Sequence, residues 1–361
     1  MCLLKLYYKM EELKTNAIIL LKKLIKTPSF SSEEQRTALV ISQWFSEHDI
    51  KFQLVKNNVW AVNKYYDISK PTLLLNSHHD TVKPNKGYTN DPWDAFEREG
   101  KLFGLGSNDA GGCLVSLMAT FTHFYRRKNL KYNLLIVASA EEENSGEHGL
   151  RGILNVLPAF EVAIVGEPTK MQMAVAEKGL LVLDGKSIGV PGHAAHGLGL
   201  NSIYQAMEDV SWIKNHQFKK KSRLLGAVKM TVTQIHAGTQ HNVIPAVTNF
   251  VVDVRVTDAY TNQEVLEIIQ KNTICDIQAR SIRHNSSSIP MEHPIVKAGL
   301  KLGLTTYGSA TLSDQACLSC PSVKIGPGDT LRSHAADEYI FIEEVEEGIE
   351  MYIKLLNDVI L

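Results

Sequence analysis

Leu73–Asp80, with the sequence LLLNSHHD, is the stretch that most clearly indicates how this chain folds. Its apolar residues lead into a polar tip that carries two histidines and an aspartate. Because strand side chains point to alternate faces, His78 and Asp80 face one side and His79 the other if the strand continues through the tip. A metal-bound imidazole usually has a carboxylate or carbonyl on its other nitrogen. The stretch fits a buried strand ending in a metal-binding corner, although a histidine near a strand end is more often an ordinary surface or core histidine.

Two further short apolar strands end in acidic residues. Leu134–Ala140 (LLIVASA) leads into three glutamates at positions 141–143, and Val162–Gly166 (VAIVG) leads into Glu167. Helices that alternate with short, fully apolar strands are typical of a mostly parallel sheet covered on both faces. Ligands of such sheets bind beyond the carboxyl ends of the strands, where all these polar residues are expected. The sequence therefore predicts an α/β fold with a site at this edge.

The pattern changes from about Lys178. Several segments there alternate apolar and polar residues as antiparallel strands do, and two helical segments accompany them. We expect a smaller α+β domain inserted into the first. The predicted catalytic domain is residues 1–177 and 289–361, and the predicted inserted domain is residues 178–288.

The N-terminal part carries helical signals. Apolar residues recur at helical spacing over Thr15–Lys26. Ser31 begins an S-x-x-E pattern that closes on Glu34, a capping-box signature for a second helix running to about His48. The first ten residues lack the long apolar core and the cleavage site of a signal peptide, so we interpret them as a ragged start.

Composition excludes several classes of function. The 361 residues are 44% hydrophobic and 21% charged, with a formal net charge of −1. This is typical of a globular protein, with room for two domains of roughly 150 residues each. A nucleic-acid-binding surface normally shows a basic excess, which is missing here. No apolar run approaches the roughly 18 residues of a membrane span.

The five cysteines are odd in number and scattered along the sequence. This favours a reducing compartment, so a cytoplasmic location is expected. Cys317 and Cys320 form a single C-x-x-C, and a structural zinc site would need a second ligand pair. Pro321 and an apparent strand follow, whereas a thioredoxin-like motif opens a helix. Neither role is expected of this pair.

The histidines and carboxylates at the predicted strand ends and in neighbouring loops form a mixed ligand set. Imidazole and carboxylate groups together suit zinc, cobalt or manganese better than calcium or magnesium. Two metals about 4 Å apart need one shared carboxylate and about two further ligands each. The set meets that need with a glutamate to spare. It consists of His78, Asp80, Asp109, Glu142, Glu143, Glu167 and His334.

Six motifs, in this order, carry a family resemblance: HHD, GSNDAGG, AEEENSG, VGEPT, GVPGHAAHG and SHAADE. Together they resemble the dinuclear zinc amidohydrolases, a family that includes acetylornithine deacetylase, succinyl-diaminopimelate desuccinylase, aminoacylase and the glutamate carboxypeptidases. The resemblance spans essentially the whole chain and is strongest to the acetylornithine (or acetylcitrulline) deacetylase branch. It implies a zinc-peptidase-like catalytic domain, an inserted dimerisation or lid domain, a homodimer, and two divalent ions, zinc or alternatively cobalt.

The resemblance also implies a ligand role for each matching residue. His78, Asp109 and Glu167 would bind one metal. Glu143 and His334 would bind the other, with Asp109 bridging the two.

Further roles implied by the resemblance concern catalysis and substrate binding. Glu142 would be the general base, and Asp80 would orient the histidine ligand. His193, in the motif GHA, would reach the substrate carbonyl from the partner subunit. Asn242 and Arg255, in HNVIP and DVR, would grip a substrate carboxylate, for which an arginine fork is well suited. An arginine on an exposed strand is the alternative.

The sequence departs from the family pattern at a few positions. Gly111 stands where relatives often have lysine, and Glu141 stands where aspartate is usual. The segment LSDQACL resembles a family S-D-A-R stretch but has Ala316 at the arginine position. The missing positive charge counts against a dicarboxylate substrate and favours a monocarboxylate N-acyl amino acid.

We therefore expect a metal-dependent hydrolase of a small N-acyl amino acid, with N-acetylornithine or N-acetylcitrulline in arginine biosynthesis as the first candidates. A desuccinylase and a metallodipeptidase or aminopeptidase are the alternatives within the family. A non-catalytic binding homologue is the rival from another class, but such proteins usually lose a ligand or the base, and here all are present. No nucleic-acid or membrane partner is expected.

Overall fold

The computed structural model describes residues 2–361, with the side chains of residues 9–361. The chain divides into two compact units. Unit 1 comprises the chain up to Val175 with Ile289–Tyr307 and Ser313–Leu361, and unit 2 comprises Ala176–Ser288 with Gly308–Leu312. Unit 2 thus begins and ends close to the expected insertion and also takes up residues 308–312. One contact of that extra segment is the N–H of Lys178, which donates to the carbonyl of Ser309 over 3.1 Å.

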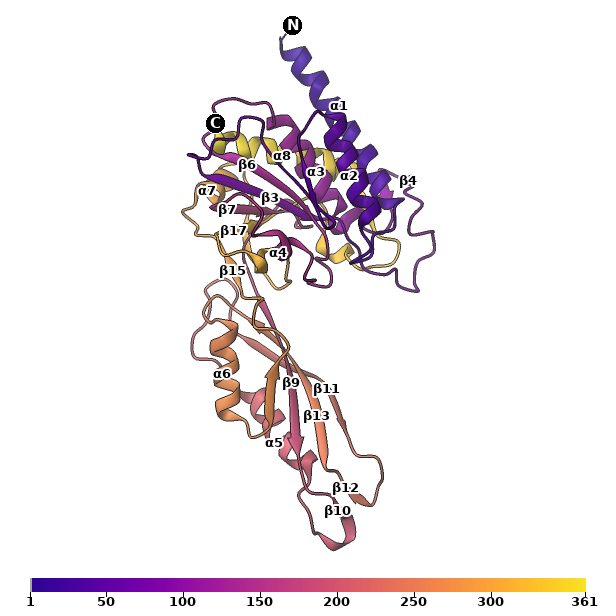
Figure 1. Cartoon of the computed structure of the whole chain (residues 1–361), viewed down its shortest axis with the longest axis vertical. Helices are drawn as coiled ribbons and strands as arrows, with labels where there is room; N and C mark the ends of the chain where they lie inside the picture. The colour runs from indigo at the N-terminus through magenta and orange to yellow at the C-terminus, as the bar shows by residue number, and fades with distance from the viewer. Residues whose placement is uncertain (1) are drawn as a thin grey trace. The chain divides into compact units, whose positions relative to one another are not determined.

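A mostly parallel sheet forms the centre of unit 1 (Figure 1). From β1 to β8 its strand order is β1-β2-β6-β3-β7-β17-β8, and β15 (Ser287–Ser288) and β16 also pair with β8. The central strands are parallel: β6 and β7 pair with the two edges of β3, and β17 pairs with β7. The strands are β1 (Gln53–Val55), β2 (Asn58–Val62), β3 (Thr72–His78), β6 (Asn133–Ser139), β7 (Val162–Val165), β8 (Met173–Glu177), β16 (Thr306–Ser309) and β17 (Ser322–Lys324). The predicted α/β class is confirmed.

Helices cover both faces of this sheet and bury its central strands on both sides. Leu73 and Leu75 of β3 pack into the core formed with the larger helices, and Leu74 between them packs on the opposite face with Leu150 and Ile153 of α4. This is why the central strands are continuous apolar runs. The larger helices are α1 (Cys2–Ile25), α2 (Gln35–Glu47), α3 (Gly112–Phe124), α7 (Pro294–Lys301) and α8 (Ile342–Ile360), and α4 is Leu150–Ile153.

Short elements complete unit 1. A small sheet has the order β18-β5-β4. Its strands are β4 (Glu97–Arg98), β5 (Lys101–Phe103) and β18 (Tyr339–Phe341), and the helical turns are η1 (Ser107–Gly111), η3 (Asp314–Cys317) and η4 (Thr330–Arg332).

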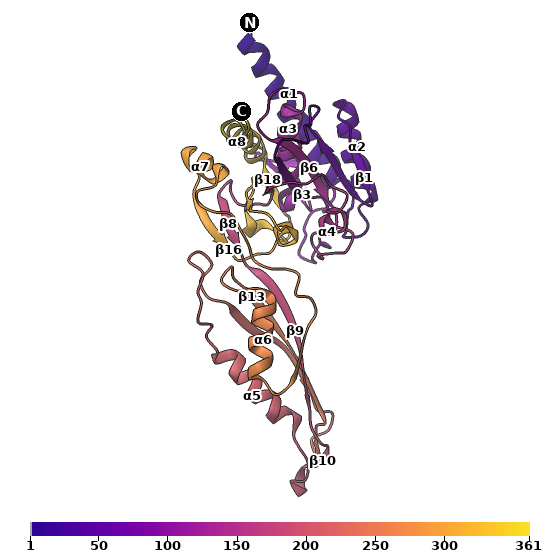
Figure 2. The same cartoon turned by 60° about the vertical axis from the view of Figure 1, so that its left-hand side comes forward.

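Unit 2 is an antiparallel sheet with two helices packed on one face (Figure 2). The sheet order is β11-β13-β9-β14, and β10 and β12 form a separate pair. The elements are β9 (Gly179–Ile188), β10 (Gly192–His193), η2 (Ala194–His196), α5 (Ser202–Asn215), β11 (Lys229–Ala237), β12 (Val243–Ile244), β13 (Val247–Val256), α6 (Asn262–Asn272), β14 (Asp276–Ala279) and β15 (Ser287–Ser288). Among the described residues, no helix of either unit is long and apolar enough to cross a membrane.

The predicted starts of the first two helices are wrong. The first helix was expected from Thr15, but the chain is helical from Cys2 onward, Met1 lying outside the described residues. The S-x-x-E pattern does not cap the second helix, which begins at Gln35 without a side-chain cap. Its serine and glutamate instead make hydrogen bonds beside the site described next: Ser31 donates to Asp80, and Glu34 accepts from Asn57 and from the N–H of Glu141.

Candidate metal centre

The residues of the predicted metal set lie where the parallel strands of unit 1 end. His78 is the last residue of β3, Glu167 lies just beyond β7, and Glu143 lies in the loop after β6. Asp109 belongs to η1, directly before α3, and His334 to the loop after η4. The carboxyl ends of parallel strands meet at one edge of a sheet, so the fold brings ligands together from distant parts of the sequence.

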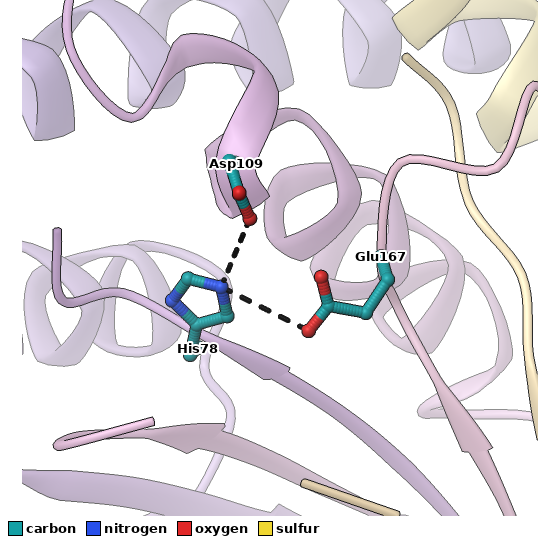
Figure 3. Close-up of side chains that lie close together, drawn as sticks. All are labelled: His78, Asp109 and Glu167. Carbon is teal, nitrogen blue, oxygen red and sulfur yellow. Dashed lines mark hydrogen bonds and ion pairs between the residues drawn. The ribbon is translucent and has the colours of Figure 1, made fainter. Parts of the chain in front are cut away.

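One group of potential ligands forms around His78 (Figure 3). Its Nε2 atom lies 3.3 Å from Asp109 Oδ1 and 3.9 Å from Glu167 Oε1. One ligand atom from each of these residues lies within 4.8 Å of the others. The two carboxylates point toward the same imidazole nitrogen, as Figure 3 shows. A single cation in the space between them would contact all three side chains.

A second group shares Asp109 with the first. His334 Nε2 lies 3.0 Å from Glu143 Oε2 and 3.6 Å from Asp109 Oδ2. Asp109 thus presents one oxygen toward each histidine, which is the arrangement of a bridging carboxylate. A shared carboxylate with an imidazole and a further carboxylate on each side fits two divalent ions, and the donor types suit zinc or a similar metal.

The tip of β3 is arranged as the strand alternation predicts. His78 Nδ1 lies 3.0 Å from the backbone carbonyl of Asp80 and 3.4 Å from its Oδ1. A carbonyl only accepts, so Nδ1 carries a proton, and Nε2 faces the carboxylates of Asp109 and Glu167. His79 points elsewhere: its Nδ1 lies 2.9 Å from the hydroxyl of Thr37, and its Nε2 lies 2.9 Å from the carbonyl of Asn57.

The carboxylate of Asp80 also holds the loop after β6. It accepts the backbone N–H groups of Glu142 and Glu143, each over 3.1 Å, and the hydroxyl of Ser31 over 2.7 Å. Burial alone would raise its pKa, but the hydrogen bonds from His78 and Ser31 and the charge of His78 keep that pKa below its usual value. Asp80 therefore connects a potential ligand on β3 to the two glutamates beyond β6.

Crowding of carboxylates gives the site a strong demand for positive charge. Burial, followed by the charge of Asp109, raises the pKa of Glu167 to about 8, against the opposing effect of His78. Burial and the charges of Glu167, Asp314 and Glu143 raise the pKa of Glu142 well above its usual value. Divalent cations would relieve both effects, because an opposite charge favours the ionised form of a carboxyl group.

Glu142 belongs to neither group of potential ligands, although the charges of His78 and Glu167 act on it.

Sequence reasoning missed the role of Glu338. Its buried carboxylate accepts the N–H groups of Gly106, Asn108 and Asp109 over 3.1, 2.8 and 2.9 Å. Burial first, and then the charge of Asp109, raises the pKa of Glu338 to about 8. Glu338 therefore holds the turn that carries Asp109. The signal for it was its place as the last residue of SHAADE.

Asp314 was also missed, although LSDQACL had been noted. Its carboxylate is buried and accepts the hydroxyl of Ser139 over 2.6 Å, and burial raises its pKa to about 6. Ser139 is the last residue of β6 and pairs with His78. Asp314 therefore lies next to the sheet edge at which β3 and β6 end.

Next to Ala316, the side chain of Cys317 contacts Arg151, whose Nη2 lies 3.8 Å from the sulfur. Both thiols of the C-x-x-C pair are free. Burial raises the pKa of Cys317 and of Cys320 to about 11. Thiols with such pKa values are protonated at neutral pH, and the protonated thiol is a poor nucleophile.

The three candidate residues of unit 2 do not lie together. His193 pairs with Val243, and the N–H of Ala194 donates to the carbonyl of Asn242 over 2.9 Å, so His193 and Asn242 are neighbours. Arg255 pairs with Leu180 at the start of β9, whereas β10 follows the far end of that strand. At about 3.4 Å per residue, Leu180 and the last residue of β9 are roughly 27 Å apart.

In one chain Asn242 and Arg255 therefore lie apart, and the expected carboxylate grip by these two residues stays a prediction. Arg255 also makes two hydrogen bonds to Asp253, over 2.9 and 3.1 Å, so its guanidinium is already paired on its own strand. The alternation of the strand places residues 253 and 255 on the same face, and sequence proximity alone did not reveal the distance to Asn242.

Comparison with known proteins decides the family. Residues 74–358, most of the chain, match the family described as "Peptidase family M20/M25/M40". The chain belongs to this family. The protein is thus a metal-dependent amidohydrolase, in agreement with the family resemblance of the sequence and with the two ligand groups of unit 1.

Individual relatives cover nearly the whole chain. Acetylornithine deacetylase of Proteus mirabilis is 27% identical over 375 residues, which cover 94% of this chain and 96% of that protein. Succinyl-diaminopimelate desuccinylase 2 of Ruegeria sp. is 22% identical over 372 residues and covers 93% of both. The structure is similar to that of Bacillus subtilis YXEP, a dinuclear metal-binding peptidase, with a TM-score of 0.73, 17% identity and coverage of 97% of this chain and 98% of that chain.

Proposed function

We propose that this protein removes the acyl group from a small N-acyl amino acid, with N-acetylornithine or N-acetylcitrulline as the first candidates. The observation that carries the proposal is the geometry around Asp109: two ligand groups share its carboxylate, and Glu142 stands beside them without belonging to either. The similarity to acetylornithine deacetylase supports the choice of substrate. The proposal places the reaction in arginine biosynthesis and in the cytoplasm.

The side chains divide the work as follows. His78, Asp109 and Glu167 would hold one divalent ion, and Asp109, Glu143 and His334 the other, zinc being the metal that best suits these donors. When bound, the two ions would lower the pKa of an attacking water and polarise the amide carbonyl.

Glu142 acts as the general base and then as the general acid. It accepts one from the attacking water as the new carbon–oxygen bond forms, and it delivers that proton to the amine as the carbon–nitrogen bond breaks. Asp80 keeps His78 in the tautomer that leaves Nε2 unprotonated. The products are a free carboxylic acid and a free amine, so the proton count balances without any further reactant.

A panel of substrates tests the proposed specificity. We expect the zinc- or cobalt-loaded protein to hydrolyse N-acetylornithine and N-acetylcitrulline at least about tenfold better, by kcat/KM, than succinyl-diaminopimelate, since Ala316 offers no cation for a second carboxylate. Free dipeptides serve as the third arm. Turnover of dipeptides without turnover of any N-acetyl amino acid would contradict the proposal and favour a metallopeptidase.

We also propose that two copies associate through unit 2. Exposed apolar side chains occur at the end of β9, in the segment after it, at the start of α5 and on β11, and β11 is an edge strand of the sheet as far as the described residues show. Monomers rarely expose such a set beside a free strand edge. The set is Ile188, Val190, Leu198, Tyr204, Met207 and Ile235. A two-fold pairing would cover it in both copies.

In a dimer of this kind, His193 of one copy would serve the metal centre of its partner as a donor to the substrate carbonyl oxygen. The double change Tyr204→Glu/Met207→Glu is therefore expected to give monomers and to lower kcat by about 10²- to 10³-fold, the cost of losing one such donor. Light scattering after size-exclusion chromatography measures the mass. Ile274→Glu, at a position 64% exposed but elsewhere in unit 2, is the matched control. A double variant that stays dimeric, or a fully active monomer, would exclude this arrangement.

A further inference from the structure

The S-x-x-E pattern before α2, which does not act as a capping box, leads to a feature behind the catalytic loop. Glu34 is completely buried at the start of α2, and no lysine or arginine pairs with it among the described residues. Its Oε1 accepts the N–H of Ser32 over 2.5 Å and the N–H of Glu141 over 3.2 Å, and its Oε2 accepts the side-chain amide of Asn57 over 2.7 Å. A buried carboxylate is costly unless such hydrogen bonds stabilise it.

The contact with Glu141 extends the row of hydrogen bonds that Asp80 makes to the same loop. The N–H groups of Glu141, Glu142 and Glu143 follow one another in sequence, and each donates to a buried carboxylate, the first to Glu34 and the next two to Asp80. The two acids therefore hold the backbone of the whole glutamate triplet from one side.

The conformation of Glu141 shows why the loop needs this support. Its φ is +54°, in the left-handed region that residues other than glycine rarely adopt. Its side chain is held as well: Oε1 accepts the hydroxyl of Ser32 over 2.9 Å, and Oε2 accepts the N–H of His148 over 2.9 Å. Backbone of this kind persists only where the surroundings determine it.

We propose that Glu34 is a positioning residue that, through Glu141, sets the places of Glu142 and Glu143. It does not face the substrate. If it is removed, Glu141 is free to leave its left-handed conformation, and both the base and the ligand after it shift. The inference rests on the proposed roles of Glu142 as base and Glu143 as ligand, and it assigns a function to a residue outside the metal centre.

Three substitutions at Glu34 separate positioning from simple stability. Glu34→Ala removes every acceptor, and Glu34→Asp keeps the charge but draws the acceptor back by one methylene. Glu34→Gln keeps an oxygen for Ser32 and Glu141, while its amide can face Asn57 if that side chain turns. The matched control is Glu33→Gln, at the exposed neighbouring position.

We expect Glu34→Ala and Glu34→Asp to lower kcat by about 10- to 100-fold with KM changed by less than about threefold, and to weaken one of the two metal-binding steps by about 10- to 100-fold, the range seen when the support of a ligand is lost. Glu34→Gln is expected to stay within about threefold of wild type in both measurements. Calorimetric titration of zinc into the metal-free variants gives the binding steps independently of turnover. The aspartate variant provides the test if the alanine variant does not fold.

Two outcomes would overturn the inference: unchanged kcat and zinc affinities in Glu34→Asp, or a glutamine variant more impaired than the aspartate variant. The latter would mean that the charge of Glu34, rather than its acceptor position, is what matters. If the wild-type protein hydrolysed no N-acyl amino acid, the zinc titrations would still decide the role of Glu34, so the two proposals fail separately.

Discussion

Replacement of Glu142 by alanine is expected to lower kcat by about 10³- to 10⁴-fold while the protein still binds two metal ions. General acid–base catalysis contributes up to about 10⁴-fold, and here one side chain would perform both proton transfers. Glu142 lies in neither ligand group, so its loss leaves every potential ligand in place. Its backbone N–H, which donates to Asp80 Oδ1, is also retained. Steady-state kinetics together with metal analysis of the same sample measures both parts of the prediction.

Glu147→Ala is the appropriate control, because Glu147 lies in the same loop and is exposed. It should keep wild-type turnover. If Glu142→Ala were as active as the wild type, another group would have to be the base. If it bound only one metal, Glu142 would be a ligand, and the division of roles between Glu142 and Glu143 would have to be reversed.

Alanine variants of the two adjacent histidines at the β3 tip are expected to lose different properties, one a bound metal and the other stability. His78→Ala removes a potential ligand whose Nε2 lies 3.3 Å from the bridging carboxylate of Asp109. We expect its metal content to fall from two ions to about one per chain, with a loss of kcat of more than about 100-fold, since losing only the support of a ligand already costs 10- to 100-fold.

His79→Ala, by contrast, should keep both metals and lose stability. His79 is only 6% exposed, and both of its ring nitrogens are hydrogen-bonded, to Thr37 and to Asn57. Removing it leaves a cavity and two unpaired polar groups, which together are expected to lower the free energy of unfolding by about 2–4 kcal/mol. An exposed histidine that faced away from the metal centre would be replaceable at modest cost, and the burial of His79 is what makes the expected loss larger.

Urea unfolding and metal analysis of both variants make the comparison. A His79→Ala protein that lost a metal, paired with a His78→Ala protein that kept two, would mean that the alternation of β3 does not place His78 at the metal centre. Equal loss of stability in both variants would leave metal content as the measurement that separates them.

Much of the fold followed from local patterns. Short apolar runs such as Leu73–Leu75 identified the buried parallel strands, since a strand covered on both faces has no polar side to show. Residues directly after such strands had to meet at one sheet edge, so His78 and Glu167 were correctly expected to lie near each other. The alternation of apolar and polar residues that indicated antiparallel strands in the inserted segment is also a local pattern. For this reason the expected start of that segment lies within two residues of the start of unit 2.

Patterns that depend on long-range partners were less informative. Ser31 and Glu34 have the spacing of a capping box, but their side chains bind Asp80, Asn57 and Glu141, none of which the spacing reveals. Asn242 and Arg255 are close in sequence but lie at different ends of β13, because an extended strand carries successive residues steadily apart.

The sequence of LLLNSHHD by itself determined that a strand ends in histidine and aspartate, and that alternate side chains of its tip face opposite ways. Only the tertiary structure decided which residues each side chain contacts. His78 faces Asp109 and Glu167, and His79 is enclosed by α2 and the β1–β2 turn. Alternation along a strand is a property of the backbone, whereas the partner on each face is supplied by segments far away in sequence, which packing alone brings into contact.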